Sequence, residues 1–162
     1  MSKVLIVAEH HDGHLNAATA RCVSAALALK AQSIDVLVLS DAPDAVAAQA
    51  AKLDGISRVL SIANAANAAP IAQVLAPQVA KAADGYSHVF APSTTFGKDL
   101  LPCVAALLGV AQISDVMAVE SSHVFQRPIY AGNAIITVQA PAGQTVVATI
   151  RTASWPAVAA TA

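Results

Sequence analysis

Four short runs rich in apolar residues recur along the first hundred positions of the chain. They span residues 4–8, 34–39, 58–62 and 88–91. Runs of this length without regular alternation of apolar and polar positions are typical of strands that are buried on both faces of a parallel sheet. The pattern therefore predicts four parallel strands.

Longer segments with apolar residues at helical spacing separate these runs. Helices are predicted over residues 17–30, 45–53 and 70–83, and from Ser93 or Thr94 to residue 108. Asn16 can cap the first of them, and Gly109 can end the last. Strands that alternate with helices at this spacing form right-handed crossovers, which predicts a parallel sheet with helices on both faces.

After Ala111 the chain changes to segments typical of strands, with no helix between them. These segments span residues 116–119, 123–126, 135–139 and 145–152. We expect them to be antiparallel additions to one edge of the sheet, with residues 140–144 as the turn between the last two. The predicted fold class is α/β: a three-layer, mostly parallel Rossmann-like sheet with helices on both faces and antiparallel strands added in the last third.

The composition narrows the function classes. The chain has 162 residues, of which 56% are hydrophobic and 12% charged, and a net charge of −1. The length predicts a single domain. Because the chain has no basic patch, we expect it not to bind nucleic acid. Residues 59–80 carry no charge, but their asparagines, glutamines and prolines argue against a membrane span. The abundant alanine suits close helix–sheet packing; the alternative is an exposed apolar face that a partner covers.

The amino-terminal residues and the cysteines bear on the cellular compartment. Met1 to Lys3 lead directly into a predicted strand, without the pattern of a signal or transit peptide. We therefore expect a cytoplasmic bacterial protein. Cys22 and Cys103 both fall in apolar helical patterns without a nearby partner, so we expect them to be reduced core thiols.

Two loops that follow predicted strands carry candidate chemistry. Residues 9–14 combine three histidines with two carboxylates, yet their spacing fits no chelate fixed by a helix or strand, so we expect a structural turn at Asp12 and Gly13 and no metal. Ser93, Thr94, Thr95 and Lys98 offer hydroxyls and a cation at a helix start, where phosphate can bind. The spacing is not that of a P-loop, so we expect helix capping and contact with a neighbouring domain, with phosphate binding as the alternative.

A third loop, residues 127–133, has the composition of a recognition surface. Arg127, Tyr130, Gly132 and Asn133 supply a cation, an aromatic ring, a glycine and an amide. The alternative is a structural corner in which Gly132 adopts an unusual backbone angle and Tyr130 packs. No residue order suggests a catalytic triad or paired carboxylates, so we expect no catalytic residue.

Three segments together resemble the amino-terminal domain of the electron transfer flavoprotein alpha subunit. They are residues 93–102, 112–116 and 127–136, and the resemblance extends over residues 4–155. It implies one domain over residues 1–155, followed by the start of an interdomain linker over 156–162. Cys103 departs from this family, which commonly has arginine at that place, so this chain lacks any ion pair that the arginine makes in relatives.

The resemblance also implies a role in electron transfer. In such proteins this domain and a beta subunit support a carboxy-terminal domain, which binds FAD, while AMP lies in the beta subunit. The whole heterodimer accepts electrons from acyl-CoA or other dehydrogenases and passes them to a membrane-linked quinone oxidoreductase. This segment is then a non-catalytic scaffold that binds no cofactor and, when isolated, self-associates. The rival hypothesis is a free-standing adenine-nucleotide-binding module.

Overall fold

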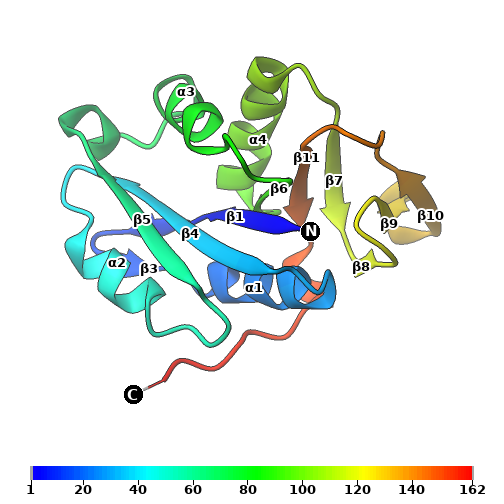
Figure 1. Ribbon diagram of the computed structural model, residues 1–162, viewed down its shortest axis with the longest axis horizontal. Coiled ribbons are helices and arrows are strands. Elements are labelled where there is room, and N and C mark those ends of the chain that lie inside the picture. Colours follow the sequence, from blue (N-terminus) through cyan, green and yellow to red (C-terminus); the bar gives the residue numbers. More distant parts are fainter. Residues whose placement is uncertain (1, 162) are drawn as a thin grey trace.

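The computed structural model describes residues 2–161, and its centre is a six-stranded sheet. Neighbouring strands pair in parallel, in the order β5-β4-β1-β6-β11-β7 (Figure 1). The strand bounds are β1 Lys3–Val7, β4 Ser33–Ser40, β5 Arg58–Ala63, β6 His88–Pro92, β7 Gln112–Val116 and β11 Val146–Ile150. The four parallel strands predicted in the first hundred residues are confirmed.

Helices cover both faces of this sheet and give three layers (Figure 1). Their bounds are α1 Ala17–Ala28, α2 Asp44–Ala50, α3 Ala72–Ala82 and α4 Thr95–Leu108. Because successive side chains of a strand point to opposite faces, Ile6 packs with residues of α1 and α2, whereas Leu5 and Val7 pack with residues of α3 and α4. The predicted α/β class is confirmed. Within residues 2–161 no helix is both long and apolar enough to cross a membrane.

The strands in the last third of the chain are arranged differently from the prediction. β11 was expected to be antiparallel, but it lies inside the main sheet and is parallel to both β6 and β7. All five of its residues are buried, and a central position in a parallel sheet covers both faces of such a strand. β7, which the sequence pattern did not predict as a strand, forms the sheet edge.

The antiparallel strands of the last third form a separate small sheet. Its order is β10-β9-β8, with the bounds β8 Ala118–Val119, β9 Val124–Ile129 and β10 Ala134–Gln139. Antiparallel strands were predicted here, but their placement on the edge of the main sheet was wrong. Phe125 of β9 is buried in the same core as Phe90 of β6, which holds the two sheets together.

Residues 155–161, which we call the strap, run across α1 and α2 (Figure 1, red). The Arg21 guanidinium donates to the Trp155 carbonyl at 2.6 Å, and the Thr161 amide donates to the Lys52 carbonyl at 2.7 Å. The segment expected to begin an interdomain linker is thus hydrogen-bonded to the domain through residue 161, while residue 162 lies outside the described residues.

Both cysteines are free thiols. Cys22 is buried in α1, and this burial raises the pKa of its thiol. Cys103 was also expected in the core, but it lies on the exposed side of α4. The helical pattern placed it correctly on a helix and wrongly on the buried face.

Candidate functional site

The hairpin between β9 and β10 presents Tyr130 to solvent. This side chain is 78% exposed, and it begins the short helical turn η2, Tyr130–Gly132. Tyr130, Ala131 and Gly132 have φ angles of 49°, 55° and 91°. A left-handed conformation costs a non-glycine residue about 1–2 kcal/mol. Gly132 thus adopts the unusual angle considered for a structural corner, but Tyr130 does not pack into the domain as that alternative required.

Two polar side chains hold this hairpin in place. The Arg127 guanidinium donates to the Ser114 carbonyl at 2.6 Å and to the Ser114 hydroxyl at 3.1 Å, which ties β9 to β7 at the edge of the main sheet. The Asn133 side-chain amide donates to the Tyr130 carbonyl at 2.9 Å. The four predicted residues therefore lie on one hairpin, with Arg127 partly buried at its base and the other three exposed at its tip.

The second predicted site, Ser93–Lys98, lies at the start of α4. Thr94 is the N-cap of this helix and accepts a bond from the Gly97 amide at 3.5 Å. The Ser93 amide donates to the Ile150 carbonyl, and the Ser93 hydroxyl is buried without a hydrogen-bond partner among the described residues. Thr95 and Lys98 are exposed. Of the two predicted capping residues, Thr94 is the one that caps.

Glu9 stands beside this helix start. The Thr94 hydroxyl donates to the Glu9 carboxylate at 2.8 Å, joining the carboxyl ends of the neighbouring strands β1 and β6. The chain runs from β1 to α1 on one face of the sheet and from β6 to α4 on the other. This is the switch point at which open α/β sheets bind ligands. At this point the Glu9 side chain therefore lies beside the amino-terminal end of α4.

Residues 10–15 form a small hairpin, β2 His10–His11 and β3 His14–Leu15. Asp12 and Gly13, the predicted turn, have φ angles of 47° and 75°, as an Asp-Gly hairpin turn with two left-handed residues requires. That prediction is confirmed. The hairpin is fixed to the sheet because the His10 imidazole donates to the Leu39 carbonyl at 2.8 Å.

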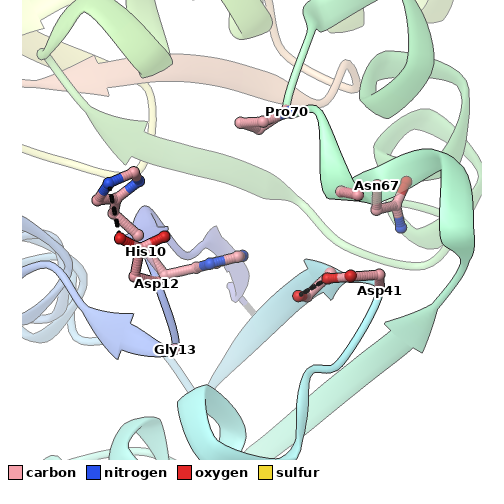
Figure 2. Close-up of a pocket in the computed structure, with 9 residues that line it drawn as sticks. His10, Asp12, Gly13, Asp41, Asn67 and Pro70 are labelled. Carbon is pink, nitrogen blue, oxygen red and sulfur yellow. Dashed lines mark hydrogen bonds and ion pairs between the residues drawn. The ribbon is translucent and has the colours of Figure 1, made fainter.

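A polar cavity of about 320 Å³ lies beside this hairpin, at the carboxyl ends of the strands. In Figure 2, His10, Asp12 and Gly13 stand on one side of it, and Asp41 and Asn67 on the other. Among residues 2–161 no three histidine, cysteine or acidic side chains are placed to hold a metal ion. The lining of this cavity offers two carboxylates, two imidazoles, one amide and one hydroxyl, but no lysine or arginine to hold a phosphate.

An ion pair between the buried Asp35 and the exposed Arg58, which the sequence pattern did not predict, lies at the opposite ends of the strands. Asp35 of β4 is fully buried and accepts bonds from Arg58 at 2.6 Å and from the Tyr86 hydroxyl at 2.5 Å. Burial, and then the bond to Asp35, raises the pKa of Tyr86 to about 12. The sequence does contain a signal for this pair, because Asp35 is the one acidic residue in an apolar predicted strand and Arg58 begins the next predicted strand.

His88 connects the two sheets. Its Nε2 donates to the Ser122 carbonyl at 2.7 Å, in the loop between β8 and β9, and its Nδ1 lies 2.8 Å from the Ser87 hydroxyl. The ring also packs against Phe90 and Phe125. Burial lowers the pKa of His88. The sequence predicted His88 only as the first residue of a strand.

Comparison with known proteins gives one consistent family. The family model described as electron transfer flavoprotein domain matches residues 4–162. A Pseudomonas aeruginosa protein named electron transfer flavoprotein subunit alpha is 50% identical over 157 residues, which cover 97% of this chain and 50% of that protein. The protein of the same name from Paracoccus denitrificans is 42% identical over 155 residues, covering 95% of this chain and 49% of that protein.

A eukaryotic relative extends the comparison. The mitochondrial electron transfer flavoprotein subunit alpha of Dictyostelium discoideum is 36% identical over 161 residues, which cover 95% of this chain and 45% of that protein. The chain therefore spans about half the length of these relatives, and it corresponds to their amino-terminal domain. The family match and these identities together show that the chain belongs to the electron transfer flavoprotein domain family, in which it resembles the alpha subunits.

Proposed function

We propose that this chain is the scaffold and subunit-docking domain of an electron transfer flavoprotein alpha subunit. In the proposed heterodimer it supports a flavin-binding domain and contacts a beta subunit that carries AMP. The complete carrier takes electrons from acyl-CoA or other dehydrogenases and passes them to a membrane-linked quinone oxidoreductase. The domain itself contributes no catalytic residue, and in isolation it self-associates through surface that its partners otherwise cover.

The exposed Tyr130 is the observation that supports the docking role. An aromatic side chain is a common anchor in protein interfaces, and it is most effective when its conformation is fixed before binding. Tyr130 sits on a left-handed turn that Asn133 closes and Arg127 ties to the main sheet. The domain thus maintains a strained backbone that exposes an aromatic ring, as expected for a residue that contacts a partner.

Tyr130→Ala tests this role. The variant should bind the beta subunit with a Kd raised by about 5- to 150-fold, the range of a typical aromatic anchor. Its melting temperature should stay close to that of the wild type, because the side chain packs against little of its own domain. Ile71→Ala, which truncates another exposed apolar side chain at the start of α3, is the matched control. If Tyr130→Ala binds the beta subunit as tightly as the wild type does, the interface lies away from this hairpin.

The residues at the switch point do not fit the pyrophosphate of a dinucleotide. Glu9 places a carboxylate beside the amino-terminal end of α4, where it would repel a phosphate. The residues after β1 also lack the glycine-rich turn that lets a backbone approach a pyrophosphate. These features support a flavin site in another part of the carrier. The purified chain should therefore be colourless after gel filtration.

The rival function is a free-standing adenine-nucleotide-binding module. The cavity beside His10 is the observation in its favour, because it lies at the carboxyl ends of the strands. Its carboxylates, Asp12 and Asp41, disfavour a phosphate group there. A thermal-shift titration with ATP, AMP and FAD separates the two functions. A melting temperature raised by adenine nucleotides supports the module, whereas an unchanged one together with beta-subunit binding supports the docking domain.

A further inference from the structure

The outer edge of β10 offers unpaired backbone groups. β10 ends the small sheet and lies at the periphery of the molecule (Figure 1). The Ala140 amide donates to the His123 carbonyl at 2.8 Å, in continuation of the β9–β10 register. Because the bonding direction of an antiparallel strand alternates, the even-numbered residues of β10 bond to β9, and Ile135, Thr137 and Gln139 direct their N–H and C=O groups outward.

This edge lacks the features that protect edge strands from pairing. Natural edges carry lysine, proline or a bulge. β10 reads Ala-Ile-Ile-Thr-Val-Gln, without a charge or a proline, and it pairs with β9 without a bulge. Ile135, Thr137 and Gln139 are also the exposed positions, and Ile135 is 56% exposed. Among residues 2–161, no backbone bond reaches this outer edge.

We propose that β10 pairs with β10 of a second copy of the chain, so that the two small sheets form one continuous six-stranded antiparallel sheet. This inference rests on the self-association included in the proposed function, and it assigns that association to one edge. A two-fold axis through Thr137 places Thr137 opposite its counterpart and Ile135 opposite Gln139 of the partner. All three outward residues then form hydrogen-bonded pairs, each exchanging two backbone bonds.

The chemistry of the edge favours a second copy as its occupant. An antiparallel pair of identical strands places each side chain opposite one from the same short sequence, so any charge on the axis would meet a like charge. β10 has none. The opposed pairs, Thr137 with Thr137 and Ile135 with Gln139, combine a β-branched pair with a mixed apolar and amide pair, and both are compatible with a pleated surface. A charged partner surface would meet no oppositely charged side chain on β10.

Sedimentation velocity of the 162-residue chain over a wide concentration range tests the proposal. The wild type should form a dimer, and Thr137→Lys should weaken it by at least about tenfold, since it puts two ammonium groups face to face. Gln73→Lys adds the same charge at an exposed position of α3 and should leave the dimer unchanged. Matching circular dichroism spectra and melting temperatures establish that the variants fold, and Ile135→Lys is the substitute if Thr137→Lys does not.

Cysteine cross-linking gives an independent measure of the same contact. In a Cys103→Ser background, Thr137→Cys should form a covalent dimer under mild oxidation, and Gln73→Cys should not. A chain that stays monomeric at all concentrations would overturn both this proposal and the self-association in the proposed function. A dimer that Thr137→Lys leaves intact would overturn only the assignment to β10. A monomer whose beta-subunit binding is lost in Thr137→Lys would overturn it as well, by assigning the edge to that subunit.

Discussion

Gly97→Ala should disrupt the junction between α4 and β6, because this helix begins directly against the strand that precedes it. A Cβ atom added at Gly97 would lie 1.9 Å from the Pro92 carbonyl oxygen and 3.4 Å from the Ala91 Cβ. Real Cβ contacts essentially never fall below 3.0 Å, so the helix start would have to move by at least 3.0 − 1.9 = 1.1 Å. Such a movement also strains the bond from Thr94 to Glu9.

The expected loss follows from two opposing effects. Overpacking of a close contact costs about 1–3 kcal/mol, and the upper end applies here because the neighbour is a backbone carbonyl. Alanine within a helix regains about 1 kcal/mol relative to glycine. Gly97→Ala should therefore lower the free energy of unfolding by about 2 kcal/mol.

Urea denaturation followed by circular dichroism measures this loss as a lower midpoint at unchanged slope. Gly85→Ala is the comparison, because Gly85 has a φ of 79° but open space around its Cβ position. That variant should lose about 1 kcal/mol, because the strain of a left-handed alanine is partly offset by the lower entropy of the unfolded chain. If Gly97→Ala proves as stable as Gly85→Ala, the close approach of α4 to β6 does not constrain the fold.

The buried His88 and the partly buried Tyr86 each give a pH-dependent prediction. Because the pKa of His88 is lowered from 6.5, its stabilising contribution is present above that pH and is lost as the pH falls below it. His88→Gln should therefore make the urea midpoint less dependent on pH between pH 7.5 and 5. Because the pKa of Tyr86 is raised from 10.0 to about 12, its contribution is lost as the pH rises through that window, and Tyr86→Phe should remove this alkaline decline while lowering stability at pH 7 by about 1.5–3 kcal/mol. A wild-type midpoint that is constant over either window would contradict the corresponding prediction.

The parallel half of the fold could be predicted because each of its strands is a local signal. Residues 34–39 were predicted, and β4 spans Ser33–Ser40; residues 88–91 were predicted, and β6 spans His88–Pro92. β11 carries the same continuous apolar signal, but no helix precedes it, so its direction could not be inferred from its neighbours in the sequence. The small sheet replaces the helix in the crossover from β7 to β11, and only tertiary structure reveals that replacement.

The candidate site was predictable in composition but not in geometry. The sequence placed Arg127, Tyr130, Gly132 and Asn133 in one loop; they share one hairpin, but Arg127 belongs to strand β9 and only the other three form the turn. It could not separate Arg127, whose partner Ser114 lies on another strand, from Tyr130, which faces solvent. Likewise the Glu9 carboxylate and the Thr94 hydroxyl are 85 positions apart, so their contact depends on the pairing of β1 with β6.

The strap has a consequence for the order in which the domain folds during synthesis. Its hydrogen bonds connect Arg21 and Lys52 to residues made more than a hundred positions later. A nascent chain whose last emerged residue is near Ile150 can complete the parallel sheet, but α1 and α2 still lack their cover. The hydrogen bonds that complete the packing of α1 and α2 can therefore form only after residues 155–161 leave the ribosome, so the strap is a late step in folding during translation.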